Sequence, residues 1–155
     1  MIYLLDTDTA ILLMRGLSLK SPKNEKQQAR QKAGRRIFSM CRRRAAAGHV
    51  IGLSAITIAE LEFGACRADD PDSERTRMDH FLAPFTAFDF DANKPTRCYG
   101  KVRSALESTG SLIGPNDLLI AAHALALEAT LVTNNLREFK RVEELNCENW
   151  STASR

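Results

Sequence analysis

Three acidic residues that lie far apart in the sequence have similar local surroundings. Asp6 directly follows the apolar run of residues 2–5, whereas Glu60 and Asp117 each lie in the first turn of an expected helix. In a parallel α/β sheet, the carboxyl ends of the strands and the amino ends of the following helices meet at one edge, where ligands bind. We therefore expect the three carboxylates to converge at that edge.

Two further oxygen donors are expected at the same edge. Asn135 directly follows the expected fourth strand, and Glu138 lies about one turn later. Clustered carboxylates repel one another unless a cation neutralises them, and oxygen ligands suit Mg²⁺ or Mn²⁺. Such ions can activate a water molecule and stabilise the leaving oxygen of a phosphodiester. The residue types at this edge therefore indicate metal-assisted phosphate chemistry.

Each acid also has a purely structural interpretation. Asp8 or, less naturally, Asp6 would cap the first helix, and a cap is the interpretation that we favour for Asp8. Glu60 lies three residues after Thr57, which is the spacing of a capping box. Asp117 would interact favourably with the dipole of its own helix. The metal hypothesis therefore depends on three acids arriving at one edge, and not on any single residue.

Strands and helices are expected to alternate along the chain. Strands are expected at residues 2–5, 49–53, 85–90 and 130–133, and an edge strand at 145–150. Helices are expected at residues 10–15, 25–47, 57–68, 73–82, 92–108 and 115–128. Gly16 and Pro22 are expected to break the helical pattern between the first two helices. This alternation predicts an α/β fold, with a central parallel sheet flanked by helices.

The length and charge of the chain suit one domain with two different faces. The chain has 155 residues, of which 44% are hydrophobic, so we expect a single domain over residues 1–155 with a sizeable core. Residues 20–49 contain ten basic residues and one acid, Glu25, whereas the rest contains twelve basic and eighteen acidic residues. We therefore expect a helix at 25–47 with a basic outer face that binds anions.

The cysteines and the apolar segments indicate the cellular location that we expect. The four cysteines form no CxxC pair, which gives little support to a thiolate zinc site. The apolar run at residues 2–5 is too short for a signal peptide, and no segment is apolar enough to span a membrane. The expected location is the reducing cytoplasm. We expect His123, in an Ala- and Leu-rich helix, to be packed or hydrogen-bonded rather than catalytic.

Four sequence blocks, in this order, resemble PIN-domain proteins, and specifically VapC-type toxins of toxin–antitoxin (VapBC) pairs. They are residues 2–8 (IYLLDTD), 53–61 (LSAITIAEL) continuing to Phe63 and Gly64, 113–124 (IGPNDLLIAAHA) and 131–139 (LVTNNLREF). The blocks cover most of the chain, and their order and intervals make the resemblance specific. It implies a PIN-like fold on a parallel sheet and a Mg²⁺-dependent endoribonuclease, for which Mn²⁺ can substitute and transfer RNA is the expected substrate.

The resemblance also implies roles for individual residues. The acids that match Asp6, Glu60 and Asp117 form the metal site of the family, and a fourth polar position maps near Asn135 or Glu138. Related proteins carry Asp at the end of the last core strand. Asn135 at this place leaves open the fourth ligand and any second metal ion.

The resemblance implies partners as well. A VapB-type antitoxin is expected to lay its carboxyl-terminal segment in a groove of the toxin and to block the site, often with a basic side chain. A homodimer is expected within the toxin–antitoxin complex. Residues 20–47 correspond to the variable region of the family, and we expect them to contact both RNA and the antitoxin.

Our mechanistic hypothesis assigns one task to each residue. Asp6 and Asp117 would bind Mg²⁺, Glu60 would bind the ion or orient its water, and Asn135 and Glu138 would hold the water shell. The activated water would attack phosphorus and leave a 5′-phosphate.

Two alternatives belong to other functional classes. Residues 6–9 (DTDT) after an apolar strand also resemble the nucleophile motif of haloacid-dehalogenase-type phosphatases, although the other motifs of that class are missing. A noncatalytic RNA-binding or protein-binding module is the second alternative.

Overall fold

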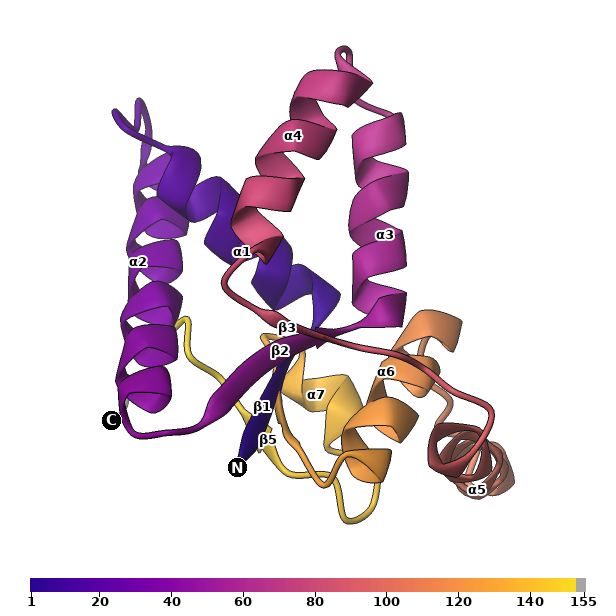
Figure 1. Cartoon of the computed structure of the whole chain (residues 1–155). Coiled ribbons are helices and arrows are strands. Elements are labelled where there is room, and N and C mark those ends of the chain that lie inside the picture. The colour runs from indigo at the N-terminus through magenta and orange to yellow at the C-terminus, as the bar shows by residue number, and fades with distance from the viewer. Residues whose placement is uncertain (153–155) are drawn as a thin grey trace.

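The computed structural model describes residues 1–152, and within this range the chain forms a central sheet with helices on both faces (Figure 1). The strands are β1 (Ile2–Leu5), β2 (Val50–Ser54), β3 (Thr86–Phe88), β4 (Thr130–Val132) and β5 (Cys147–Glu148). They lie in the order β3-β2-β1-β4-β5, and every pairing is parallel. The predicted α/β class is therefore confirmed.

At least one helix lies between every two consecutive strands. The helices are α1 (Thr7–Ser18), α2 (Glu25–Ala46), α3 (Ala55–Cys66), α4 (Pro71–Leu82), α5 (Lys94–Ser108), α6 (Pro115–Ala126) and α7 (Leu136–Phe139). Figure 1 shows α1 and α2 on one side of the sheet and α5 and α6 on the other. None of the helices within residues 1–152 is long and apolar enough to cross a membrane.

The central strand β1 divides the core into two layers. Tyr3 and Leu5 pack with Leu13 of α1 and Ile37 of α2. Leu4 points to the opposite face, where it joins a cluster formed mainly by α5 and α6. The alternation of side chains along a strand explains this division, and burial of both faces explains why β1 is apolar throughout.

The register of the three central strands sets the position of the functional edge. Leu5 is paired with Leu53 of β2 and with Val132 of β4. The residues that follow these three, which are Asp6, Ser54 and Thr133, consequently leave the sheet at the same edge.

The close contact between α1 and α2 corrects one prediction. Gly16 does not break the first helix, which continues to Ser18. A Cβ atom on Gly16 would lie 2.8 Å from Cα of Gly34 and 2.7 Å from the carbonyl oxygen of Arg30. Gly16 therefore has a packing role, because only glycine lets the two backbones approach so closely.

Several element boundaries also differ from the predictions. The first helix begins at Thr7 instead of residue 10, and the third begins at Ala55 instead of Thr57. The third strand is confined to Thr86–Phe88. The short helix α7 was not predicted, because four residues are too few for a recognisable helical period.

Candidate active site

Asp6 lies at the junction between β1 and α1 and is almost completely buried, with 3% of its surface exposed. Its Oδ1 accepts a hydrogen bond from the backbone N–H of Thr9 at 2.7 Å, and its Oδ2 accepts one from the Thr133 hydroxyl at 2.5 Å. Burial raises the pKa of Asp6, while these hydrogen bonds oppose the rise. This carboxylate is thus held by the first turn of α1 and by the residue that follows β4.

The prediction that Asp8 caps the first helix is wrong. The residue in the cap position is Asp6, whose side chain accepts from the third residue of the helix, whereas Asp8 lies inside the first turn. The difference arises because α1 begins directly at the end of β1, with no intervening loop. Asp6 therefore combines a cap role with its place at the functional edge.

Glu60 lies in the second turn of α3, not in the first, so the predicted capping box with Thr57 is wrong. Ser54 caps the helix instead, accepting a hydrogen bond from the backbone N–H of Ile56 at 3.1 Å. The Glu60 carboxylate accepts from the Thr7 hydroxyl and from the Asn116 side-chain amide, the latter at 2.8 Å. Glu60 thereby joins α3 to both α1 and α6.

Asp117 is the third residue of α6, in the first turn as predicted. The pKa of its carboxyl group is raised from 3.8 to about 6, first by burial and then by the negative charges of four neighbouring acids. These acids are, in decreasing order of effect, Glu138, Asp6, Asp8 and Glu60. Asp117 therefore lies close enough to acids of α1, α3 and α7 and of the β1–α1 junction for their charges to affect it.

The carboxylate oxygens of this site suit a hard divalent cation, although the side chains do not form a ready-made coordination site. Within residues 1–152, no three His, Cys, Asp or Glu side chains stand close enough together to hold a metal ion as they are. Both oxygens of Glu60 and both oxygens of Asp6 accept hydrogen bonds instead. The raised pKa values of Asp6 and Asp117 nevertheless indicate carboxylates whose charge a cation would stabilise.

Three polar residues of this site were not singled out from the sequence. The Thr133 hydroxyl donates to Asp6 and accepts from the backbone N–H of Asn135 at 2.9 Å. Thr7 and Asn116 both donate to Glu60. Each is adjacent to a strand end or to a predicted acid, and that position was the available signal.

Asn135 and Glu138, at the beginning of α7, differ in how they relate to this site. Asn135 precedes α7, and its side chain makes no capping hydrogen bond. The first turn of α7 contains Glu138, which is the strongest charged influence on Asp117. Of the two residues, Glu138 is therefore the one whose charge affects an acid of the site.

His123 is completely buried, and its environment agrees with the predicted packed and hydrogen-bonded role. Its Nδ1 atom lies 2.8 Å from the Ser54 hydroxyl, and its ring meets that of Phe90 edge-on at 5.3 Å. Burial lowers the pKa of His123. Because Ser54 caps α3, this contact links α6 to the beginning of the helix that carries Glu60.

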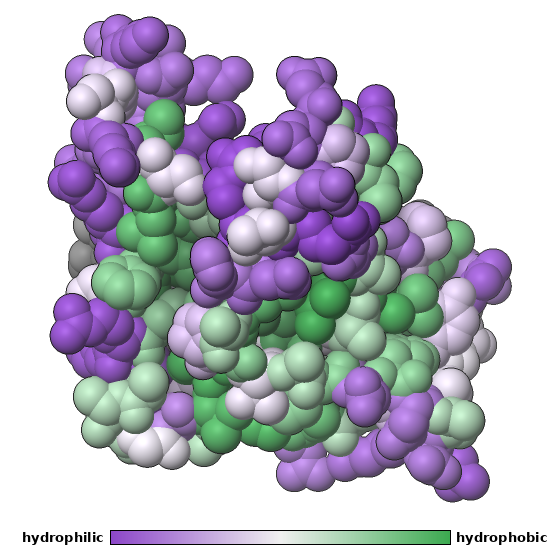
Figure 2. Space-filling model, turned by 45° about the horizontal axis from the view of Figure 1, so that its top comes forward, coloured by the Kyte–Doolittle hydropathy of each residue, from purple (hydrophilic) through white to green (hydrophobic). Residues whose placement is uncertain are grey.

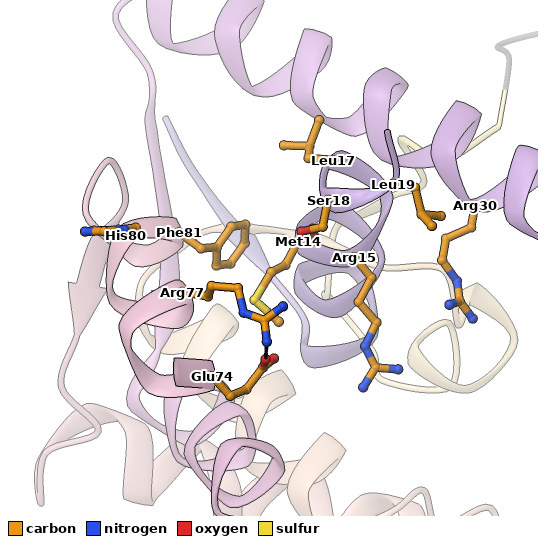
Figure 3. A pocket seen from close by; sticks show the side chains of 10 residues that line it. All are labelled: Met14, Arg15, Leu17, Ser18, Leu19, Arg30, Glu74, Arg77, His80 and Phe81. Carbon is orange, nitrogen blue, oxygen red and sulfur yellow. Dashed lines mark hydrogen bonds and ion pairs between the residues drawn. The ribbon is translucent and has the colours of Figure 1, made fainter. Parts of the chain in front are cut away.

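A groove beside α1 leads to the site. A cavity of about 570 Å³ is lined by residues of α1, α2 and α4 that include Met14, Leu17 and Phe81 (Figure 3). A second cavity, of about 680 Å³, shares Met14 with the first and extends along α3 to Glu60. We call the two together the α1–α4 groove. The space-filling view also shows apolar residues lying between hydrophilic flanks on this face (Figure 2).

Comparisons with known proteins agree on one family. The PIN domain model matches residues 3–145. Ribonuclease VapC2 of Rickettsia felis is 46% identical over 105 residues, which cover 68% of this chain and 78% of the relative. Ribonuclease VapC2 of Haemophilus influenzae is 35% identical over 148 residues, covering 96% of this chain and 97% of the relative. The tRNA(fMet)-specific endonuclease VapC of Salmonella typhimurium is 29% identical, with the same coverage.

Solved structures show the same relationship. The crystal structure of VapBC2 from Rickettsia felis bound to a promoter DNA fragment contains a chain that is 35% identical, with a TM-score of 0.76, covering 97% of this chain and 99% of that one. DNA-bound VapBC from Salmonella typhimurium gives a TM-score of 0.78 at 27% identity, covering 97% and 98%. None of these matches supports a dehalogenase-type phosphatase. The protein belongs to the PIN-domain family and, within it, to the VapC branch.

Proposed function

We propose that this protein is a Mg²⁺-dependent endoribonuclease that hydrolyses phosphodiester bonds of transfer RNA and is inhibited by an antitoxin. The observation that carries the proposal is the gathering of carboxylates at the carboxyl edge of the sheet, where burial and then four neighbouring acids raise the pKa of Asp117 to about 6. The family explains why such a cluster persists, because PIN nucleases generally use divalent metal ions. Mg²⁺ is the expected ion, with Mn²⁺ as a substitute.

Five side chains have proposed roles at the cation. Asp6 and Asp117 would bind it, Glu60 would bind it or orient its water, and Asn135 and Glu138 would hold the surrounding water molecules. When bound, the ion would activate a water for attack on phosphorus and stabilise the leaving oxygen.

The neighbouring residues of the chain orient these acids. Thr133 and the backbone N–H of Thr9 fix the two oxygens of Asp6, so its carboxylate is directed before any ligand arrives. Asn116 holds Glu60 from the first turn of α6. Such supporting hydrogen bonds keep ligands in a productive orientation. Asp117 becomes charged more readily once a cation is near, because the cation offsets the neighbouring acids.

Transfer RNA is the proposed substrate class on the basis of relatives. The VapC proteins of Salmonella typhimurium and Shigella flexneri, 29% and 30% identical to this chain, are tRNA(fMet)-specific endonucleases. Both alignments cover 96% of this chain.

A VapB-type antitoxin is the proposed partner, since the structural relatives are VapBC complexes. The α1–α4 groove suits an amphipathic segment, because Met14 and Phe81 are apolar while Arg15 and Arg77 are basic. The groove ends at Glu60, where a basic side chain of the antitoxin would meet the acids. A homodimer within that complex is also proposed.

The direct test is cleavage of total RNA and purified transfer RNAs by antitoxin-free protein. We expect discrete cuts with Mg²⁺, none with chelator, and a loss on the order of 10²–10³-fold in Asp6→Asn. Asp79→Asn, an exposed acid on α4, is the matched control and should cut normally. Equal cleavage by Asp6→Asn, or cleavage in chelator, would contradict the proposal. Binding of RNA without any cut would favour the noncatalytic alternative.

A further inference from the structure

The outer side of α2 carries a set of exposed basic side chains. We call this set, which consists of Lys32, Arg35, Arg42 and Arg43, the α2 basic face. At 3.6 residues per turn, the four lie within an arc of about 100°. The opposite side of the helix holds its buried residues, which are Gly34, Ile37 and Cys41. The four bases therefore point away from the fold.

No acid neutralises these charges within the fold. Among residues 1–152, none of the four forms an ion pair with a carboxylate. Other bases of the same helix do have partners: Arg44 pairs with Glu148, and Arg36 donates to the carbonyl of Ser151.

The composition of α2 makes this charge costly for the helix. Its only acid is Glu25, at its first residue, so no carboxylate lies one turn from any base of the α2 basic face. Like charges at such spacing destabilise a helix by a few tenths of a kcal/mol per pair. Packing within the fold therefore does not explain why this helix carries these four bases.

A nucleic acid backbone fits this face better than a protein does. From Lys32 to Arg43 the helix extends about 16 Å, along which a strand presents several phosphates. Phe38 lies beside the face with 43% of its surface exposed, and the Arg42 guanidinium is 6.0 Å from its ring centre. Exposed aromatic and arginine planes are surfaces on which unpaired bases stack. A protein interface would instead need an apolar centre, which one phenylalanine does not supply.

The fold connects this face to the candidate active site through α1. That helix is capped by Asp6 and meets α2 where Gly16 contacts Gly34. Twelve residues of α-helix span about 18 Å. An RNA that lies along the left-hand helix α2 in Figure 1 and still reaches the carboxylates must therefore extend over a comparable distance.

We propose that the α2 basic face binds the phosphate backbone of the RNA substrate, remote from the bond that is cut. This inference rests on the proposed function, since it takes RNA as the substrate. It predicts that long structured RNA binds more tightly than a short oligonucleotide, and that the difference shrinks as salt is added.

The test compares Arg35→Gln/Arg42→Gln with Arg97→Gln/Lys101→Gln, a control that removes two exposed bases from α5. Gln has nearly the same helix propensity as Arg and Lys, so both variants should fold. Binding of labelled transfer RNA is measured in chelator at several salt concentrations, where no cleavage occurs.

We expect the α2 variant to lose about tenfold in affinity near physiological salt, and its salt slope to fall by about two. The control should match the native protein. Unchanged affinity in the α2 variant, or an equal loss in both variants, would overturn the inference. A loss confined to the binding of poly-glutamate would overturn it too, because an acidic protein segment would then be the partner. Since binding is measured without cleavage, failure of the proposed nuclease activity would be seen separately.

Discussion

Two charged regions of this molecule differ in how their charges are compensated. Near the end of α2, the Arg44 guanidinium is 3.1 and 3.3 Å from the two Glu148 oxygens and 4.7 Å from the ring centre of Tyr3. Glu148 also accepts from the Trp150 indole N–H at 2.7 Å. At the carboxyl edge of the sheet, by contrast, Asp117 and its four acidic neighbours form no ion pair with a basic side chain of residues 1–152. Burial and these neighbours raise the pKa of Asp117.

This difference distinguishes charges that stabilise the fold from charges that are available to a ligand. The Arg44–Glu148 pair attaches the carboxyl-terminal segment to α2 and leaves little charge for a ligand. The clustered acids and the α2 basic face leave charge uncompensated, at a cost to the folded state. Uncompensated charge that the fold does not need is the property expected of binding and catalytic regions.

Among residues that support the acids, the largest effect is expected from Thr133→Val, which removes a hydrogen bond to a buried carboxylate. Asp6 would keep only its bond from Thr9, and a hydrogen bond to a charged group contributes about 1.5–3 kcal/mol. We expect RNA cleavage to fall about 10–100-fold. Thr130→Val is the control, because it makes the same change at the first residue of β4, at the end of the strand remote from Asp6.

The rate of transfer RNA cleavage, measured with Mg²⁺ in excess, decides this prediction. Equal rates for the two threonine variants would show that the orientation of Asp6 does not depend on Thr133.

The next largest effect is expected from substitutions of His123, which is buried and contacts Ser54. His123→Asn keeps a polar atom near the position of Nδ1 and should preserve the contact with Ser54, whereas His123→Gln places its amide elsewhere. We expect the Gln variant to lose about tenfold in cleavage and in apparent Mg²⁺ affinity, because α3 and α6 would shift relative to each other.

Thermal unfolding at increasing Mg²⁺ concentration measures that affinity independently of cleavage. A purely structural role would lower the melting temperature of both variants equally and leave their Mg²⁺ midpoints unchanged. That result would contradict a positioning role for His123.

A smaller effect is expected from Asp117→Asn in protein without metal. A pKa raised from 3.8 to about 6 means that the fold favours the neutral carboxyl, so stability is lost as the pH rises through this range. The full shift corresponds to about 3 kcal/mol, and screening at this partly exposed group reduces it to about 1 kcal/mol. The variant should therefore be about 1 kcal/mol more stable than the native protein at pH 8 and equally stable at pH 4.

Urea unfolding in chelator at the two pH values measures this difference. Added Mg²⁺ should reverse the order at pH 8, because only the native protein gains from binding it. A variant that is less stable than the native protein at pH 8 without metal would show that the charged form of Asp117 does not destabilise the fold.

The sequence was informative where a local pattern decides the structure. The apolar run before Asp6 predicted the central strand, and the alternation of elements predicted the parallel sheet. The placement of Asp6, Glu60 and Asp117 near one edge follows from that topology. Their roles at a metal ion remain predictions.

Interactions between distant residues account for what was missed. The sequence predicts a helix break at Gly16, because its contact with Gly34 depends on how two helices cross. Thr133 was overlooked because its bond to Asp6 joins residues 127 positions apart. The cap of α3 was placed at Thr57 instead of Ser54, because both are good cap residues and the strand register decides between them.

The smallest effect should come from the compensated region, with Glu148→Gln. The variant keeps an oxygen for the Trp150 indole N–H but loses the charge that pairs with Arg44. Because both side chains are about one-third exposed, the pair should contribute only about 0.5–1 kcal/mol. We expect that loss in urea unfolding and an unchanged rate of RNA cleavage. A large fall in cleavage at normal stability would place this region in contact with RNA, and the contrast between the two kinds of charge would then fail.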